Sequence, residues 1–286
     1  MNKHFLLSHD HKSGRTAKHI GLAAGAVLLP VWFSLPGRAS KKQRSRFSGV
    51  NFAHRGLHTR DMSVPENSIK AFYDAASAGY GIELDVQLSK DGQVVVFHDD
   101  TLNRVCGVDA RVNEKNYSEL KTLSLRNTAE TIPLFTDVLA VINGRVPLIV
   151  ELKTAGKKNR ELCEKTYEIL SKYSGLYCIE SFDFRIVLWF RMHHPEIIRG
   201  QLATEAKKYD LQSKTTGWLL SKNMFNTVAR PHFMAYDVDA EFPLTCRLSK
   251  LLGMVMIGWT SHSAENEKTC DSVIFEFYRP ETRFTH

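Results

Sequence analysis

Between residues 54 and 153 this chain carries five short charged motifs, and four of them follow an apolar run typical of a buried strand. The motifs are His54-Arg55-Gly56, Pro65-Glu66-Asn67-Ser68, Glu83-Leu84-Asp85, His98-Asp99-Asp100 and Glu151-Leu152-Lys153. Together they hold two histidines, several carboxylates, an arginine and a lysine. Side chains of these types, gathered at one place, suit metal-assisted attack on a phosphodiester.

The Glu83-Leu84-Asp85 motif is the best candidate for a metal site. Residues i and i+2 of a strand point to the same face, so Glu83 and Asp85 reach one space while Leu84 faces the other way. Glu151 ends the apolar run 146–150 and offers a third carboxylate. Carboxylate oxygens suit Ca²⁺ or Mg²⁺ better than zinc. An exposed strand face is the plainer interpretation of the motif taken alone.

His54 and His98 each follow an apolar strand run at a turn. Beside a carboxylate cluster we expect them to form a proton-transfer pair, in which one deprotonates the nucleophile and the other protonates the leaving alkoxide. Each such proton transfer accelerates the reaction roughly 10²–10⁴-fold. Either histidine alone is more simply a structural residue. Asp99 and Asp100 orient an imidazole or cap a turn, and the cap is the favoured interpretation.

Lys153 lies two residues after Glu151, on the same face of the predicted strand. An ion pair between the two accounts for this spacing as well as any function does. Together with Arg55, Lys153 would hold the non-bridging oxygens of a bound phosphate. Gly56 either lets the backbone approach that phosphate or is a plain turn glycine.

Short apolar strands alternate with helical stretches from residue 50 onward. The predicted strands are 50–53, 81–86, 93–97, 146–150, 176–179, 197–201, 233–236, 254–257 and 272–275, and the clearest helices are 68–78, 136–142 and 160–173. This alternation predicts an α/β fold with a parallel sheet covered by helices. About 240 residues suit a closed TIM (β/α)8 barrel, which we predict over residues 48–286. An open doubly wound sheet is the alternative, but no glycine-rich phosphate loop follows the first strand.

The net charge of +7 belongs to the N-terminal segment. Residues 1–47 hold nine of the 38 Lys and Arg residues and one of the 31 Asp and Glu residues, which leaves 29 basic and 30 acidic residues for the rest. A near-neutral body has no basic face for a nucleic-acid backbone, so we expect no nucleic-acid partner. The five cysteines form no C-x-x-C pair, which argues against zinc and disulfides and favours buried thiols.

Residues 20–36 form an apolar run with basic residues on both flanks. This pattern predicts an N-terminal hydrophobic helix that anchors the chain in a membrane, with a basic tail before it and a linker up to residue 47. A signal peptide cleaved near Gly37-Arg38-Ala39 is the less favoured alternative, because Arg38 and further cations follow the run. We therefore expect a single-pass membrane protein rather than a secreted one. The two flanks carry similar positive charge, so the membrane side stays open.

Taken in order, these motifs resemble those of the glycerophosphodiester phosphodiesterase family. Between residues 52 and 104 they read H-R-G, P-E-N-S, I-E-L-D-V, K-D-G, V-V-F-H-D and L-N-R, followed by I-P-L-F, E-L-K, S-F and W-T as far as residue 260. The resemblance implies a TIM-barrel enzyme that hydrolyses glycerophosphodiesters to glycerol 3-phosphate and an alcohol.

The resemblance also implies a role for each site residue. It gives His54 and His98 as acid and base, Arg55 and Lys153 as phosphate ligands, Glu83, Asp85 and Glu151 as ligands of Ca²⁺ or Mg²⁺, Glu66 and Asn67 as supporting residues, and Phe182 and Trp259 as pocket walls. The chain departs from the family pattern after Trp259, where the pocket for the alcohol is expected. Two alternatives stay open: a lysophospholipase D-like activity on membrane lysolipids, and a non-catalytic membrane-tethered barrel that binds a phosphorylated ligand.

Overall fold

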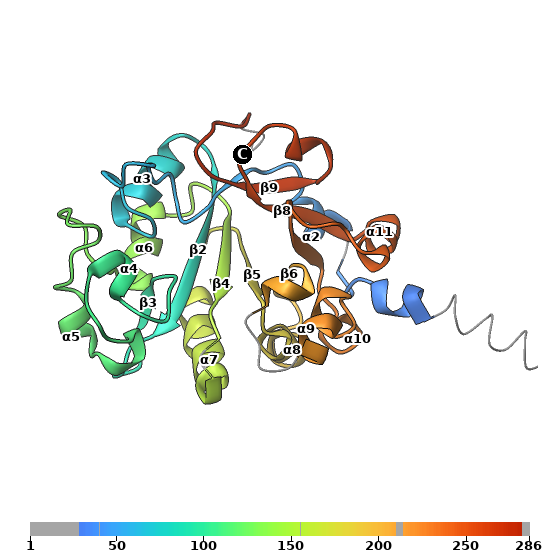
Figure 1. Ribbon diagram of the computed structural model, residues 1–286, viewed down its shortest axis with the longest axis horizontal. Helices are drawn as coiled ribbons and strands as arrows, with labels where there is room; N and C mark the ends of the chain where they lie inside the picture. Colours follow the sequence, from blue (N-terminus) through green and yellow to red (C-terminus); the bar gives the residue numbers. More distant parts are fainter. Residues whose placement is uncertain (1–28, 40, 155, 210–213, 282–286) are drawn as a thin grey trace, which may run out of the picture.

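The computed structural model describes residues 29–39, 41–154, 156–209 and 214–281. Eight parallel strands of this described part close into a barrel in the order β1, β2, β4, β5, β6, β7, β8, β9, and β9 pairs again with β1 (Figure 1). They are β1 (Phe52–Ala53), β2 (Gly81–Leu88), β4 (Leu148–Leu152), β5 (Tyr177–Ser181), β6 (Arg199–Ala203), β7 (Phe233–Asp237), β8 (Val255–Ser261) and β9 (Ser272–Phe275). The predicted TIM barrel is confirmed.

Helices surround the barrel, as the ribbon in Figure 1 shows. They are α2 (Lys41–Ser45), α3 (Ile69–Ser77), α4 (Asn103–Cys106), α5 (Tyr117–Leu120), α6 (Phe135–Ile142), α7 (Asn159–Leu170), α8 (Phe184–His193), α9 (Lys214–Ser221), α10 (Asn226–Ala229) and α11 (Leu244–Leu251), with 3₁₀ turns η1 (Val112–Glu114), η2 (Gly156–Lys158), η3 (Ala206–Lys208) and η4 (Asn266–Lys268). Ser68 caps α3, since its Oγ accepts a hydrogen bond from the Ala71 amide at 3.1 Å. This cap fixes where the chain turns from the first loop into its helix.

Successive residues of each strand point alternately to the outside and to the inside of the barrel. Outward residues such as Leu84 and Val150 pack against the helices, beside Phe72 and Phe135. Inward residues near the N-terminal ends of the strands, such as Phe233, form an apolar plug. Burying each large apolar side chain contributes roughly 1.5–3 kcal/mol. Toward the C-terminal ends, the inward positions are taken by carboxylates, so the plug forms the floor of a polar mouth.

The segment after β2 forms a small lobe of its own. Strand β3 (Val94–Val96), predicted as 93–97, pairs antiparallel with β2 and lies outside the barrel order. The polar stretch that follows carries α4, η1 and α5, and its apolar residues Val105, Val112 and Leu120 are buried with Val95 and Ile132 in a separate cluster. The lobe holds the loop that carries the second predicted histidine.

Most of the predicted anchor, residues 20–36, lies outside the described residues. Among the described residues, 29–34 are helical. The chain then passes the end of the barrel where the strands begin, since the Gly37 amide donates to Pro231 O at 2.7 Å and the Gly49 amide donates to Asp271 O at 2.8 Å. No helix in the described ranges has the length and apolar character needed to cross a bilayer. All five cysteines are free and four of them are buried, as predicted.

Candidate active site

Four buried carboxylates form a group at the C-terminal ends of three neighbouring strands. Glu83 and Asp85 belong to β2, and the strand register places Asp85 opposite Glu151 on β4 and Glu151 opposite Glu180 on β5. The four residues are between 0 and 7% exposed. Glu83, Asp85 and Glu151 each offer an oxygen within 4.8 Å of the others. The three predicted metal ligands therefore lie together, with a fourth carboxylate beside them.

The carboxylates carry more negative charge than their surroundings balance. Burial raises the pKa of Glu83 well above its usual value, and the charges of Asp85 and Glu151 raise it further. Burial also raises the pKa of Glu180, again with Glu151 and Asp85 adding to the effect. Asp85 Oδ1 and Glu180 Oε2 are buried and accept no hydrogen bond. Oxygen donors of this kind fit a hard divalent cation, which would offset the cost of burying them.

Two basic side chains lie against the carboxylates. Lys153 Nζ is 2.9 Å from Glu151 Oε1 and 3.5 Å from Asp85 Oδ1, and Arg55 Nε is 3.5 Å from Asp85 Oδ2. Burial alone would raise the pKa of Asp85, but the charges of His98, Lys153 and Arg55 hold it well below its usual range. Both predicted phosphate ligands thus reach the site, and in this structure each pairs with a carboxylate.

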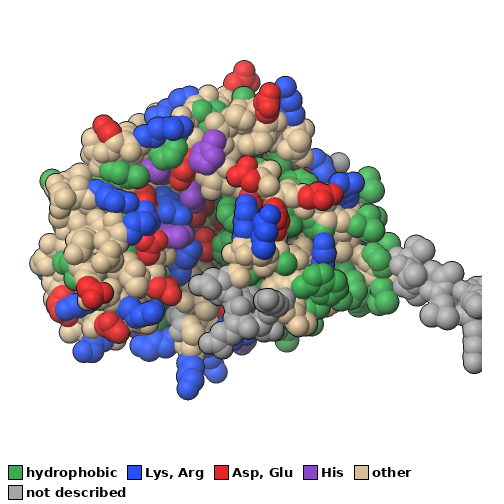
Figure 2. Space-filling view, viewed as in Figure 1, with side chains coloured by type: hydrophobic (Ala, Val, Ile, Leu, Met, Phe, Trp, Pro, Cys, Tyr) green, Lys and Arg blue, Asp and Glu red, His purple; other side chains and the backbone are tan. Residues whose placement is uncertain are grey.

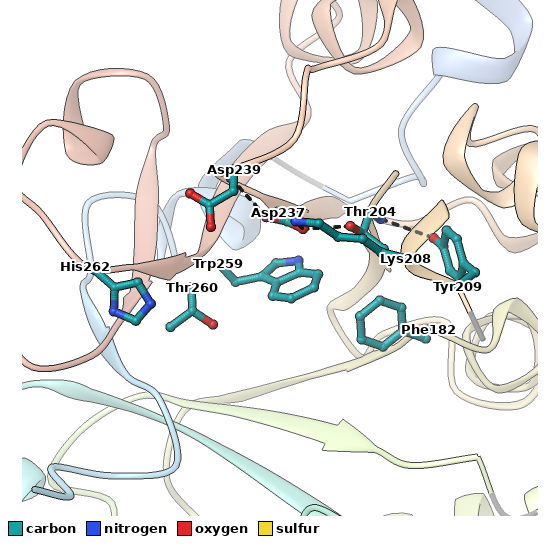
Figure 3. A pocket seen from close by; sticks show the side chains of 9 residues that line it. All are labelled: Phe182, Thr204, Lys208, Tyr209, Asp237, Asp239, Trp259, Thr260 and His262. Atoms are coloured by element: carbon teal, nitrogen blue, oxygen red, sulfur yellow. Dashed lines mark hydrogen bonds and ion pairs between the residues drawn. The ribbon is translucent and has the colours of Figure 1, made fainter. Parts of the chain in front are cut away.

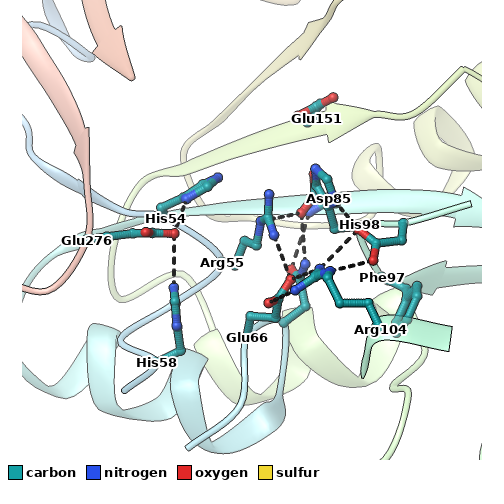
Figure 4. Close-up of polar contacts among 12 residues, drawn as sticks. His54, Arg55, His58, Glu66, Asp85, Phe97, His98, Arg104, Glu151 and Glu276 are labelled. Atoms are coloured by element: carbon teal, nitrogen blue, oxygen red, sulfur yellow. Dashed lines mark hydrogen bonds and ion pairs between the residues drawn. The ribbon is translucent and has the colours of Figure 1, made fainter. Parts of the chain in front are cut away.

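His54 is held on one side and faces the carboxylates on the other. Its Nδ1 lies 2.6 Å from Glu276 Oε1, while its Nε2 is 3.8 Å from Glu83 Oε2. His58 shares the same Glu276 oxygen at 3.2 Å, so the carboxylate lies between two imidazoles (Figure 4). Burial and the charge of Arg55 together lower the pKa of His54 to about 4, although the hydrogen bond to Glu276 opposes this shift. The imidazole is therefore neutral at pH 7, with one nitrogen oriented by Glu276.

His98 has an equivalent partner in Asp99, whose Oδ1 lies 2.6 Å from His98 Nδ1. Arg104 holds this aspartate with hydrogen bonds of 2.6 and 3.0 Å. The turn cap favoured for Asp99 is therefore wrong, because its carboxylate is shared by an imidazole and a guanidinium. Asp100, in contrast, is exposed and lies 3.8 Å from Arg111.

The two predicted supporting residues join the parts of the site. Glu66 accepts hydrogen bonds from Arg55 at 2.6 Å and from Arg104 at 2.7 Å, and so lies between the two guanidinium groups (Figure 4). Burial opposes ionisation of Glu66, but the two arginines lower its pKa to about 2. Asn67 donates to Asp85 Oδ2 at 2.8 Å. These contacts tie the loop after β1 to the carboxylates of β2.

Two neighbouring cavities at this end of the barrel share Phe182, Trp259 and Thr260 as lining residues. The first, of about 100 Å³, is lined by His54, His98 and three of the four carboxylates, those of Glu83, Glu151 and Glu180. Phe182 and Trp259, predicted as pocket walls, stand edge to face at 5.4 Å on its boundary with a second cavity of about 560 Å³ (Figure 3). From outside, Figure 2 shows a hollow in which histidine, acidic and basic side chains gather. Phe182 and Trp259 thus form walls of both the charged site and a wider pocket beside it.

Several site residues were not singled out from the sequence. They are His58, Arg104, Glu180 and Glu276. Glu180 and Glu276 directly follow the apolar runs 176–179 and 272–275, just as Glu151 follows 146–150. The position of Glu180 and Glu276 directly after a predicted strand could therefore have identified both as residues of the barrel mouth.

The protein is thus a TIM barrel. Its site combines a cluster of carboxylates of the kind that binds metal ions with two histidines that each contact a further carboxylate. The sequence profile of the Glycerophosphoryl diester phosphodiesterase family matches residues 54–275, more than half of the chain, and the chain belongs to this family. The family resemblance seen in the motifs is confirmed.

Individual relatives agree with this assignment. A glycerophosphodiester phosphodiesterase of Bacillus altitudinis is 37% identical over 131 residues, which are 43% of this chain and 52% of that protein. A lysophospholipase D of Rattus norvegicus is 28% identical over 151 residues, 48% of this chain and 46% of that protein. The chain thus spans about half the length of these relatives.

A solved structure shares the fold over a larger part of both chains. The phosphodiesterase of Oleispira antarctica, in complex with its product sn-glycerol-3-phosphate, has a TM-score of 0.66 at 22% identity and covers 80% of this chain and 93% of its own. At this identity the likeness is one of fold.

Proposed function

We propose that this protein hydrolyses glycerophosphodiesters to glycerol 3-phosphate and an alcohol, with the help of a divalent metal ion. The observation that carries the proposal is the arrangement of two histidines around the carboxylate cluster. Each imidazole is bound at Nδ1 by a carboxylate, Glu276 for His54 and Asp99 for His98, at 2.6 Å in both cases. This leaves the Nε2 atom of each ring for proton transfer, which is the requirement for acid and base catalysis.

In the proposed reaction, one imidazole Nε2 takes the proton of the attacking hydroxyl as its oxygen bonds to phosphorus. The bond from phosphorus to the alcohol oxygen breaks, and the other imidazole gives that oxygen a proton. Glu276 and Asp99 hold His54 and His98 in the required tautomer and orientation. If the attacking hydroxyl is that of water, this step gives glycerol 3-phosphate directly. If it is a hydroxyl of the glycerol moiety, the step gives a cyclic phosphate, and a second attack by water on phosphorus opens the ring to glycerol 3-phosphate.

The phosphate would be bound by Arg55, which lines the cavity, and by Lys153, which lies 2.9 Å from Glu151 of the cavity wall; both side chains are half-buried. Glu83, Asp85 and Glu151 would hold Ca²⁺ or Mg²⁺, a role supported by the orphaned Asp85 Oδ1 and the raised pKa of Glu83. When bound, such a cation polarises the phosphate and stabilises negative charge in the transition state.

The direct test measures glycerol 3-phosphate released from glycerophosphocholine by the purified full-length chain, with Ca²⁺ and Mg²⁺ in parallel. Chelation should abolish the activity, and His54→Ala should reduce kcat roughly 10²–10⁴-fold, as loss of a proton-transfer group does. His193→Ala, at an exposed position of α8, is the matched control and should keep full activity. Activity that survives chelation or His54→Ala contradicts the mechanism.

A lysophospholipase D-like activity is the second candidate, and the wider cavity favours it. Its walls include Phe182, Tyr209 and Trp259, an aromatic surface beside the charged site. Lysophosphatidylcholine in micelles and glycerophosphocholine in solution should therefore be compared in one assay. A higher kcat/KM for the lysolipid would favour this candidate, and binding of either compound without product would favour a non-catalytic barrel.

We also propose that residues 20–36 anchor the protein in a membrane as a single-pass segment. Support comes from the apolar run and its basic flanks. The protein should resist extraction from membranes by alkaline carbonate, and protease treatment of intact cells should reveal which side carries the barrel. A mature N-terminus near residue 40, found by mass spectrometry, would show a cleaved signal peptide instead.

A further inference from the structure

Helix α11 presents its leucines to the outside of the barrel. Cys246 and Ser249 are its buried residues, whereas Leu244 and Leu251 are 63% and 82% exposed. These two leucines are seven residues apart and so lie on the same side of the helix. A helix on a soluble barrel normally buries its large apolar side chains, so this outer face is suited to contact with something apolar.

The N-terminal segment lies directly beside this face. Ser34 Oγ donates to Thr245 O of α11 at 3.1 Å, and Arg230 donates to Trp32 O at 3.0 Å. The Arg230 guanidinium also lies over the Trp32 ring, 4.4 Å from its centroid. Leu29 and Trp32 are each 55% exposed. Figure 2 shows hydrophobic side chains at the right-hand edge, and in the same view Figure 1 has the blue helix near α10 and α11.

We define the α11 flank by its exposed apolar residues, which come from three elements. They are Leu29, Trp32, Val228, Leu244 and Leu251. Basic residues accompany them on the same elements and on α8: Arg191, which donates to Val228 O, Arg230, Arg247 and Lys250. The acidic residue Glu241 lies 3.9 Å from Arg247. The flank therefore combines apolar side chains with positive charge.

We propose that the α11 flank lies on the surface of a lipid bilayer that contains anionic lipids. Apolar side chains next to basic ones are the pattern of a surface that inserts partly into the headgroup region, where tryptophan is also favoured. The course of the chain identifies the occupant: the described residues begin at Leu29 within the flank, and the preceding residues 20–28 continue the same apolar run. The proposal rests on the proposed membrane attachment and not on the proposed hydrolysis.

Docking in this way leaves the active site open to water. The hollow that holds the site faces the viewer in Figure 2, whereas the flank forms the right-hand edge of the same view. A bilayer against the flank thus lies beside the mouth of the barrel and does not cover it. Water-soluble diesters can then reach the site while the protein stays on the membrane.

The test measures the surroundings of fluorescent labels on the full-length protein in vesicles of phosphatidylcholine and phosphatidylglycerol. A Cys106→Ser background removes the half-buried thiol. Single cysteines are then labelled at Leu244→Cys and Leu251→Cys, with Tyr73→Cys as the control on α3, where Tyr73 is 53% exposed. Quenching by iodide reports water, and quenching by doxyl-labelled phosphatidylcholine reports lipid.

Labels on the flank should be quenched by the doxyl lipid and lose most of their access to iodide, while the label at position 73 shows the reverse. Iodide access equal to that of the control overturns the proposal, because the flank then faces water. Protection from both quenchers also overturns it, since a second copy or residues 20–28 then cover the flank. None of these readouts depends on turnover, so failure of the proposed hydrolysis would be seen separately.

Discussion

Replacing Glu276 with glutamine should slow catalysis while leaving substrate binding nearly unchanged. Glu276 is a positioning residue, because its Oε1 lies 2.6 Å from Nδ1 of His54 and 3.2 Å from Nε2 of His58. Glutamine keeps the shape of the side chain and can still accept one hydrogen bond, but it lacks the negative charge. The imidazole at position 54 would then be held less firmly in the tautomer that leaves Nε2 for proton transfer.

The size of the effect follows from the hydrogen bond that is weakened. A hydrogen bond to a charged group contributes about 1.5–3 kcal/mol. With about 1.4 kcal/mol for each tenfold change in rate, kcat should fall roughly 10-fold to 150-fold. KM should change little, since Glu276 does not line the cavity beside the carboxylates. Initial rates of glycerol 3-phosphate release at saturating and low substrate separate the two parameters.

Two further variants show whether the effect passes through His54. Glu265→Gln makes the same change at an exposed residue of the β8–β9 connection and should keep the native kcat. Glu276→Gln added to His54→Ala should have almost no additional effect, because the histidine that it positions is gone. A double variant whose loss equals the product of the two single losses would refute the reasoning, as would native activity of Glu276→Gln.

Four further changes test other parts of the structure. Glu151→Gln should weaken Ca²⁺ or Mg²⁺ binding in calorimetric titration by at least tenfold, because it removes one of three candidate ligands. Glu180→Gln should raise the Tm of the chelated protein by about 2–4 °C for each kcal/mol gained, since it removes a buried carboxyl group whose Oε2 lacks a hydrogen bond and whose ionisation burial, Glu151 and Asp85 oppose. Gly56→Ala should lower the free energy of unfolding in urea by about 1–3 kcal/mol, because φ is +81° and a Cβ would lie 2.8 Å from the Ala71 backbone. Burial and the charge of Arg199 lower the pKa of His232 to about 3, so the unfolded chain binds its proton first as the pH falls. Stability should therefore drop by about 2 kcal/mol between pH 6.5 and 5, and this drop should be smaller in His232→Gln.

The barrel and its carboxylates could be predicted because both follow from local patterns. Alternation places Glu83 and Asp85 on one face of β2, and the apolar run before Glu151 identifies a strand end. Parallel strands bring such ends to one mouth, so their proximity follows from the fold class. The structure has these three residues together, as expected.

A strand end marks Glu276 as a residue of the barrel mouth, but its pairing with His54 could not be predicted in the same way, because it depends on how distant segments meet. Glu276 follows the last strand and reaches His54 only because β9 closes the barrel against β1. Glu66 joins Arg55 to Arg104 through a lobe whose fold has no simple period. Sequence spacing alone gives no distance between such residues.

The pairing of Lys153 and Arg55 with carboxylates links metal binding to phosphate binding. Lys153 lies 2.9 Å from Glu151, and both Lys153 and Arg55 lie 3.5 Å from Asp85. The carboxylates that would hold a cation are the same ones that neutralise these two side chains. A divalent cation held by these residues would share that negative charge, so the hold of the carboxylates on Lys153 and Arg55 would weaken and both could turn toward a phosphate. Thermodynamic linkage then requires that phosphate also tighten metal binding by the same factor. Titration of glycerol 3-phosphate with and without Ca²⁺, and of Ca²⁺ with and without glycerol 3-phosphate, should give equal ratios of Kd, both well above one. Ratios of one would show that the two sites are independent despite their shared carboxylates.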